Sequence, residues 1–370
     1  MTSAVAAPSF ERFAATDADL DAAVRLSALV WLPPRRKFEA ALRHGTATAV
    51  LDAVLGGELG SEGDRREAAR ADAAEIRAAA DAIGASPIPI GAASYPPQLA
   101  SLPDPPLLLY VTSRLPKDVT RCVSIVGTRR ASDAGREIAT SLGRGLARAG
   151  VTVVSGAARG IDAAAHAGAL DGGGPTLAVL GCGVDQTAPN RRLIERIRAE
   201  GTLVSEFPPG TRPHPRHFPS RNRIVAGLSR ATVVVEGPDR SGALITAEHA
   251  MEFGREVFAV PGAVTSPLSA ATLRLIREGA GAIGGVDDLL ADLGIDAATP
   301  SALAIELTDD ERRALGELRG ATLPDRVATA LGVTVVDALG LLMRLELRGL
   351  VRSVGGRFEA TLAARSLVAS

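Results

Sequence analysis

Short β-branched runs alternate with amphipathic stretches through the middle of the chain. Each run is long enough for one strand, and each stretch between two runs is long enough for a helix. Parallel strands need such crossover connections, so the alternation predicts an α/β fold with a doubly wound parallel sheet, covered by helices on both faces. The predicted strands are residues 123–126, 151–154, 177–180, 203–204, 233–235 and 257–260.

The segments before this region have a different character. Residues 1–85 contain short helical patterns and little ionisable chemistry, so we expect an all-helical domain that packs or docks. Its fourth helix, rich in alanine, is predicted to run to Ile83. Residues 86–106 are proline-rich, which predicts an extended strap at a domain boundary. The central domain is then expected to cover residues 107–297.

A composition break at residues 298–307 predicts a linker to a third domain at residues 308–370. Three helical patterns, the first opened by a capping box, are followed there by a Gly-Gly turn between two short strands. Three helices and a hairpin are the outline of a winged-helix domain. The third helix carries Glu346 beside Arg344 and Arg348. DNA contact by this domain is therefore no better supported than a protein-contact or purely structural role.

Composition limits where the chain works and what it binds. The formal net charge of −1 argues against bulk attraction to membranes or nucleic acid, so such binding requires a local patch. No apolar run is long enough to span a bilayer and no signal peptide is evident, so we expect a soluble, cytoplasmic protein without a membrane partner. Cys122 and Cys182 lie in apolar runs without metal-ligand spacing and are expected to be reduced, buried thiols.

Positive charge is concentrated between Thr211 and Arg223. This stretch holds four arginines, two histidines and no acidic residue. A protein of ordinary net charge marks a site for a polyanion in this way. Only 3% of the residues are aromatic, and Phe218 and His217 are the stacking candidates beside these arginines. One or two stacked bases contribute about 1–3 kcal/mol each, so phosphate contacts are expected to dominate the affinity.

In a doubly wound sheet the strand-to-helix loops emerge at the carboxyl edge, where ligands bind. Nearly all of these loops are glycine-rich here, and most carry an arginine. Glycine lets backbone amides approach an anion, helix N-termini add partial positive charge, and arginine supplies forked donors that match phosphate oxygens. We therefore expect a trough for phosphates at this edge. Its loops are residues 127–130, 155–160, 181–185, 206–223 and 236–242.

Two helix starts in these loops are candidate phosphate contacts. Ser241 and Gly242 open a helix whose free amides and hydroxyl can hold a phosphate. Arg221 and Arg223 flank Asn222, which either holds the loop, contacts a base edge or caps the helix. Each arginine taken singly is equally well explained as a solvated or salt-bridged surface residue. Their joint placement on one edge favours phosphate binding.

Several enzyme classes lack their signatures. Neither the Gly-x-x-x-x-Gly-Lys-Ser/Thr loop of nucleotide hydrolases nor the Gly-x-Gly-x-x-Gly loop of nicotinamide enzymes occurs. Metal-ligand clusters are absent from the sequence too, so we expect neither metal nor cofactor. Asp162 and His166 lie four residues apart, but no nucleophile stands beside them. They are expected to be a first-turn acid and a packed side chain, so no catalytic residue is predicted.

Taken together in this order, the loops resemble the DNA-processing protein A family (DprA, also called Smf). The resemblance is strong over about residues 95–293. Its motifs are Ser-Gly-Ala-Ala-Arg-Gly-Ile-Asp from Ser155, Ser-Glu-Phe-Pro-Pro-Gly from Ser205, Phe-Pro-Ser-Arg-Asn-Arg-Ile-Val-Ala-Gly from Phe218, and Gly-Arg-Glu-Val-Phe-Ala-Val-Pro-Gly from Gly254. The chain departs from the family pattern where it has Ala188-Pro189 in place of Tyr-Pro, and again at Ala271-Thr272-Leu273.

The resemblance implies an extended Rossmann-like domain between a SAM-like helical domain and a winged-helix domain. It implies a homodimeric protein, not known as an enzyme, that binds single-stranded DNA. Such a protein protects incoming DNA in natural transformation and helps load the RecA recombinase onto strands covered by single-strand-binding protein. By position, its phosphate pocket would involve Gly127, Arg129, Ser155, Gly156, Arg159, Arg221, Asn222, Arg223, Arg240 and Ser241.

Two other interpretations compete with this one. The first is a hydrolase of nucleoside monophosphates on the same type of fold. Those enzymes carry a Pro-Gly-Gly-x-Gly-Thr-x-x-Glu signature, to which Ser241, Gly242, Thr246 and Glu248 bear a faint likeness without the Pro-Gly-Gly start. The second is a scaffold that mainly docks other proteins.

Overall fold

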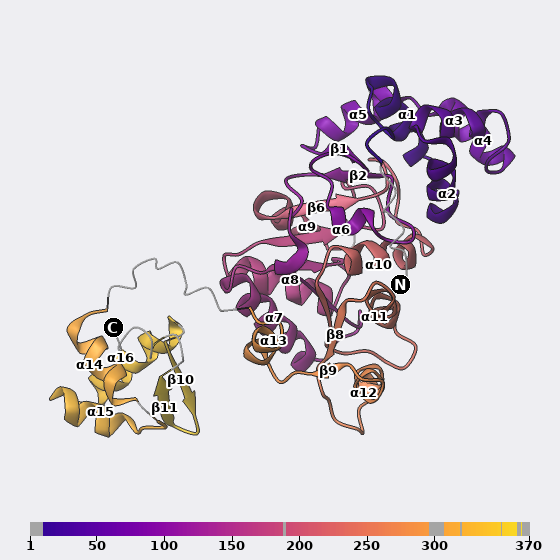
Figure 1. The fold of residues 1–370 in the computed structure, drawn as a ribbon. Helices are drawn as coiled ribbons and strands as arrows, with labels where there is room; N and C mark the ends of the chain where they lie inside the picture. The colour runs from indigo at the N-terminus through magenta and orange to yellow at the C-terminus, as the bar shows by residue number, and fades with distance from the viewer. Residues whose placement is uncertain are drawn as a thin grey trace, which may run out of the picture. The chain divides into compact units, whose positions relative to one another are not determined.

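The computed structural model describes residues 10–187, 190–295, 307–318, 320–348, 350–360 and 364. The chain divides into two compact units, Met1–Pro300 and Ser301–Ser370 (Figure 1). The predicted linker at residues 298–307 lies outside the described residues except for its last residue.

The first unit is built on a nine-stranded sheet with the order β1-β2-β6-β5-β4-β3-β7-β8-β9. Strands β3 to β9 are parallel, whereas β1 and β2 run antiparallel at one edge. The predicted doubly wound parallel sheet is confirmed, with six of its strands close to the expected residues. The strands are β1 (Ser86–Pro89), β2 (Leu108–Val111), β3 (Cys122–Val126), β4 (Thr152–Ser155), β5 (Thr176–Val179), β6 (Thr202–Ser205), β7 (Ala231–Val234), β8 (Glu256–Ala259) and β9 (Gly281–Ala282).

Helices cover both faces of the sheet because its apolar side chains alternate between two cores. Val123 and Ile125 of β3 face a core with α7, α8 and α13, whereas Val126 of the same strand faces a core with α9, α10, α11 and α12. Cys122 and Cys182 are free and buried in the second core, as predicted. The helices are α7 (Asp133–Arg148), α8 (Ile161–Asp171), α9 (Arg191–Glu200), α10 (His217–Gly227), α11 (Gly242–Glu252), α12 (Ala270–Arg277) and α13 (Val286–Asp292).

Five helices precede the sheet in the part of the chain described from residue 10. The side chain of Thr16 caps the first of them. We predicted one fourth helix, which is wrong, because two helices occupy this segment. The Asp72 side chain accepts hydrogen bonds from the amides of Ala74 and Glu75 and so starts the second of them. The helices are α1 (Asp17–Ser27), α2 (Pro34–His44), α3 (Ala47–Leu55), α4 (Glu62–Arg70) and α5 (Ala73–Asp81).

The proline-rich residues 86–106 form part of the sheet's edge. They supply β1 and the short α6 (Pro97–Ala100), and the Tyr95 hydroxyl donates a hydrogen bond of 2.7 Å to the carbonyl of Pro106. A single cluster of buried residues extends from Phe10 to Leu275, so the first five helices share a core with the sheet. The domain boundaries before residue 107 stay predictions.

The second unit has its own core. It contains α14 (Asp309–Glu317), α15 (Pro324–Leu331) and α16 (Val335–Leu347), followed by the antiparallel pair β10 (Val351–Val354) and β11 (Arg357–Ala360). This order matches the helices and hairpin that we expected, and the winged-helix assignment stays a prediction. No single helix in the described parts of the chain is long and apolar enough to cross a membrane. The helices α15 and α16 have the required length and composition only when they are counted together, and a 107° bend separates them.

Candidate nucleic-acid interface

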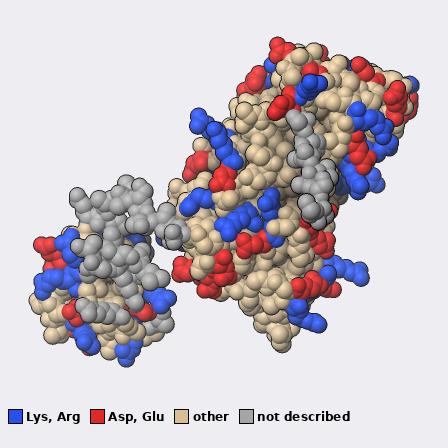
Figure 2. Space-filling model, in the orientation of Figure 1, with Lys and Arg blue, Asp and Glu red and all other residues tan. Residues whose placement is uncertain are grey.

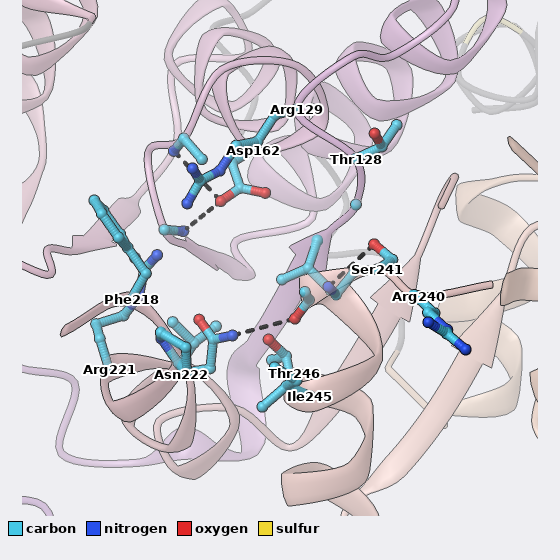
Figure 3. Close-up of a pocket in the computed structure, with 18 of the residues that line it drawn as sticks. Thr128, Arg129, Asp162, Phe218, Arg221, Asn222, Arg240, Ser241, Ile245 and Thr246 are labelled. Carbon is cyan, nitrogen blue, oxygen red and sulfur yellow. Dashed lines mark hydrogen bonds between the residues drawn. The ribbon is translucent and has the colours of Figure 1, made fainter. Parts of the chain in front are cut away.

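The order of the parallel strands reverses between β3 and β7. Connections lead from β3 to β4 on one side of the sheet, and later to β7 on the other side. At such a switch point the loops at the carboxyl ends of the two strands diverge and leave a crevice. A hollow of about 410 Å³ lies here, with Arg129 and Asp162 on one side and Arg240 and Ser241 on another (Figure 3).

Three loops around this hollow are tied to one another. The amide of Thr128, after β3, donates a hydrogen bond of 2.8 Å to the carbonyl of Glu236, after β7. The amide of Ile161, at the start of α8, donates to the carbonyl of Thr128 at 3.3 Å. The Glu236 carboxylate accepts from the amide of Ser132 at 3.0 Å and from its hydroxyl at 2.5 Å. The loops therefore form one preorganised rim.

A second hollow of about 470 Å³ adjoins the first, beyond the carboxyl ends of β4 and β5. Arg129, Gly156, Ala158 and Phe218 line both hollows. Between them, the Arg129 guanidinium carbon lies 4.8 Å from the centre of the Phe218 ring, a cation–π contact. The two hollows form one trough along the carboxyl edge, which we call the edge trough.

Four exposed arginines border the edge trough: Arg129, Arg130, Arg159 and Arg240. Within the described part of the chain, none of the four forms an ion pair, whereas Arg35, Arg136, Arg191 and Arg274, on four of the helices, each pair with a carboxylate. Lys and Arg side chains also gather near the middle of one face of the larger unit (Figure 2). Unpaired guanidinium groups remain available to phosphate oxygens. Arg130 was not among the predicted contacts, although it lies next to Arg129 in the same loop.

Arg221 lies beneath the trough. It is 4% exposed, and its guanidinium donates a hydrogen bond to the carbonyl of Val179. Burial lowers the pKa of Arg221, and the negative charge of Asp162 opposes that shift. A Cβ atom on Gly156 would meet the guanidinium, so a larger residue there would have to displace this side chain. Arg221 thus lines the first hollow from below.

Asp162 organises the loop after β4. Its carboxylate accepts hydrogen bonds from the amides of Gly156 at 3.2 Å and Ala158 at 3.4 Å. The amide of Gly156 is thereby occupied, contrary to our expectation that this loop's amides face an anion. Burial raises the pKa of Asp162, and Arg221 opposes the rise. The loop conformation depends on this carboxylate.

His166, one turn further along α8, is buried, and its Nδ1 lies 2.7 Å from the Thr176 hydroxyl. Burial lowers the pKa of His166 to about 3, so the ring stays neutral. This agrees with its interpretation as a packed side chain. Within the described residues, no group of three or more His, Cys, Asp or Glu side chains is placed to hold a metal ion.

Two of the predicted contacts lie inside the protein. Ser155 is fully buried, and its hydroxyl donates to the carbonyl of Ile125 at 2.6 Å. Arg223 is 2% exposed and donates to both carboxylate oxygens of Glu206 at 2.8 Å and to the carbonyl of Asp104 at 2.9 Å. Residues two apart on a helix point in different directions, so Arg223 faces the core where Arg221 faces the trough. Neither Ser155 nor Arg223 can reach a phosphate in this structure.

The remaining predicted residues lie at the trough. Gly127 packs so closely that a Cβ atom there would approach Ile161 to 2.5 Å. The Ser241 hydroxyl accepts from the amide of Ala243 at 3.2 Å and caps α11. Asn222 donates to the carbonyl of Gly242 at 3.2 Å, which ties α10 to α11 and favours its interpretation as a loop-holding residue.

The two departures from the family pattern have different outcomes. Ala188 and Pro189 lie outside the described residues, while the next residue, Asn190, donates to the carbonyl of Ala157 at 2.9 Å beside the second hollow. Ala271 is buried in α12, and its amide donates to the carbonyl of Gly237 at 3.0 Å. This second segment therefore supports the loop after β7 from behind.

Comparisons with known proteins agree with this geometry. Residues 86–294 match the family described as DNA recombination-mediator protein A. Protein Smf of Escherichia coli is 37% identical over 293 residues, covering 73% of this chain and 76% of that protein. The DNA processing protein DprA of Bacillus subtilis is 40% identical over 217 residues, covering 57% and 72%. Protein Smf of Synechocystis is 46% identical over 206 residues, and the match spans only 52% of that protein and 54% of this chain.

A solved structure gives the same result. The DNA processing protein A of Streptococcus pneumoniae is 33% identical and superimposes with a TM-score of 0.62, covering 72% of this chain and 95% of that one. The Helicobacter pylori protein, studied for its single-stranded DNA binding mode, is 26% identical over 56% of this chain, with a TM-score of 0.49. From the family match and the E. coli relative, the chain belongs to the DNA recombination-mediator protein A family.

Proposed function

We propose that this chain binds single-stranded DNA in the edge trough and mediates recombination of that DNA. The observation that carries the proposal is the set of four exposed arginines, without an ion pair among the residues that the structure describes, that three different loops bring to one edge. Arginine forks match phosphate oxygens, and a phosphate chain running along the edge can meet several of them in turn. Phe218, held against Arg129 between the two hollows, offers a ring for one base.

The family resemblance extends this proposal to partners. The chain would act in the cytoplasm as a homodimer, protect incoming DNA during natural transformation, and help the RecA recombinase replace single-strand-binding protein. A direct assay follows RecA filament formation on DNA precoated with single-strand-binding protein. The proposal predicts a shorter lag when this protein is present, and an Arg129→Ala variant that fails to shorten it.

Binding itself is tested with fluorescent oligonucleotides of different length and strandedness. Affinity should rise with length, because more phosphates and bases are contacted, and single strands should bind more tightly than duplexes. The matched control for Arg129→Ala is Arg148→Ala, because Arg148 is also exposed but lies in the last turn of α7, at the opposite edge of the sheet. Equal affinity for single strand and duplex, or no binding, would overturn the proposal.

The competing hydrolase needs a carboxylate that faces its substrate. Glu248, the acid that the faint signature supplies, is exposed on α11 and does not line either hollow among the described residues. Asp162 lines the first hollow, but loop amides occupy its carboxylate. We therefore favour a binding protein without catalytic residues. Release of free base from a nucleoside monophosphate, measured by chromatography, would favour the hydrolase instead.

A further inference from the structure

An exposed aromatic group lies beside the edge trough. Trp31, the single tryptophan of the chain, follows α1 and is 58% exposed. Its ring meets His214 edge-on, with the centroids 4.8 Å apart and the planes at 87°. His217 supports it from another side at 5.6 Å. We call Trp31 and His214 the Trp31 platform.

The Trp31 platform rests on buried rings. His217 is buried and stacks on the buried Phe207, with the centroids 4.3 Å apart and the planes 24° from parallel. The amide of Arg216 donates to Nδ1 of His214 at 3.3 Å, which fixes that ring. A large ring that is held in place but remains open to solvent is preorganised for stacking, because little side-chain entropy is left to lose.

The Trp31 platform is continuous with the edge trough. Pro213 lines the second hollow and Pro215 lines the first, so His214 stands between two trough residues. Consecutive Cα atoms are about 3.8 Å apart, so the Cα atom of His214 lies at this distance from a residue that lines each hollow. A strand that leaves either hollow over this loop passes the Trp31 platform.

The charge of the loop fits a nucleic acid. Arg212 and Arg216 flank His214, both are exposed, and neither forms an ion pair within the described residues. Positive charge beside an exposed aromatic ring is the combination that sequence-independent single-strand binders use. A hydrophobic protein partner would offer no negative charge to these two cations.

We propose that the Trp31 platform stacks a base of the single strand after it leaves the edge trough, and so lengthens the binding site toward the N-terminal helices. This inference rests on the proposed function. It assigns a binding role to a residue outside the predicted pocket and outside residues 86–294, which match the family model.

The sole tryptophan makes the proposal measurable in the full chain. Oligothymidylates of about 4 to about 16 nucleotides, the range of single-strand site sizes, are titrated while Trp31 emission and affinity are recorded. The shortest should bind with unchanged emission, and longer ones should quench it. Trp31→Ala should weaken the longer ones by ~10-fold and leave the shortest unaffected. Trp31→Phe should restore most of the affinity, and Leu42→Ala, at another exposed apolar residue, is the control.

Four other results would each overturn the inference. If oligonucleotides of all lengths bind without a change in Trp31 emission, or Trp31→Ala binds the longer ones as tightly as the wild type, the base does not stack there and the proposed function still stands. If Trp31 emission changes with protein concentration without DNA, the platform is covered by a second copy of the chain. If no oligonucleotide binds at any length, the proposed function fails as well.

Discussion

Arg129 and Arg223 show how differently two arginines of one carboxyl edge are used. Arg129 is exposed, lies against Phe218 and is unpaired within the described residues. Arg223 is buried between Glu206 and Asp104, which neutralise it. The first is available to a ligand, whereas the second holds α10 against the loop after β6 and the segment before β2.

Replacing Arg223 by Ala is therefore expected to act on stability. Removal of one partner leaves the Glu206 carboxylate buried without its main counter-charge, which costs about 3–5 kcal/mol. Urea unfolding should show this loss, and Arg148→Ala, an exposed arginine, should stay within about 0.5 kcal/mol of the wild type. An Arg223→Ala protein with a normal unfolding midpoint and weakened DNA binding would show that we have placed this side chain wrongly.

The ion pair between Arg223 and Glu206 also makes the stability of the fold depend on pH. Burial works to raise the pKa of Glu206, but the charge and hydrogen bonds of Arg223 outweigh it, and the pKa is lowered from 4.5. A carboxylate with a lowered folded pKa contributes stability above its unfolded pKa and loses it as the pH falls through the folded one. Glu206→Gln should be less stable than the wild type at neutral pH, and this gap should narrow below about pH 4.5. A gap in urea midpoints that is constant with pH would refute this account.

At this scale the sequence predicts which residue types gather at the edge but not which way each one points. Helical geometry separates Arg221 and Arg223 by roughly 200° around α10, so their divergence could have been found from spacing. Nothing local indicates that Ser155 is buried, because its hydroxyl bonds the carbonyl of Ile125 on a neighbouring strand. Trp31 was missed for the same reason, since its ring partners lie far along the chain.

At the scale of elements, the rim depends on loops that fix one another. Gly160 has a φ of 83°, and a Cβ atom there would lie 2.2 Å from the carbonyl oxygen of Thr128. Thr128 immediately precedes Arg129, so the start of α8 sets the position of the loop that carries this arginine. Close backbone approach, and not only turn geometry, requires glycine at this position.

Gly160→Ala and Gly173→Ala form a matched pair that tests this. Both glycines have positive φ, but no atom lies within 4 Å of a Cβ on Gly173. Gly173→Ala puts a side chain at a positive φ, which costs about 1–3 kcal/mol. Gly160→Ala should lose more stability, because its ψ of −126° lies outside the left-handed helical region and its Cβ meets the Thr128 carbonyl, and it should also bind DNA less tightly. Chemical unfolding and oligonucleotide titration measure the two effects. Equal losses of stability and equal DNA affinity would show that the contact with Thr128 does not position the rim.

Strand-helix alternation is sufficient to predict the parallel part of the sheet, since apolar runs buried on both faces stand out from their surroundings. The alternation does not reveal β1, because its prolines led us to predict an extended strap there. An edge strand tolerates proline, since one side of it forms no hydrogen bonds to a neighbouring strand. The two-residue β9 is too short to leave a pattern. The break between α4 and α5 was signalled by Asp72, a capping residue within an alanine-rich run.

For the whole molecule, the distribution of charge matters more than its sum. The formal net charge is −1, and carboxylates pair with some arginines elsewhere on the surface, such as Arg77, Arg196 and Arg230. The exposed arginines of the edge trough are unpaired among the described residues. A nearly neutral protein can thus carry a local anion site without attracting polyanions everywhere. The sequence allowed this inference because the arginines fall in loops that the fold brings to one edge.

The most direct test of this account is the salt dependence of single-stranded DNA affinity in single-arginine variants. Each phosphate contact contributes a log-log slope of about −0.7 for single strands. Arg129→Ala, Arg159→Ala and Arg240→Ala should each flatten the slope by about that amount, while Arg148→Ala at the opposite edge should leave it unchanged. Slopes that are the same for all four variants would contradict the claim that the edge trough holds the phosphates.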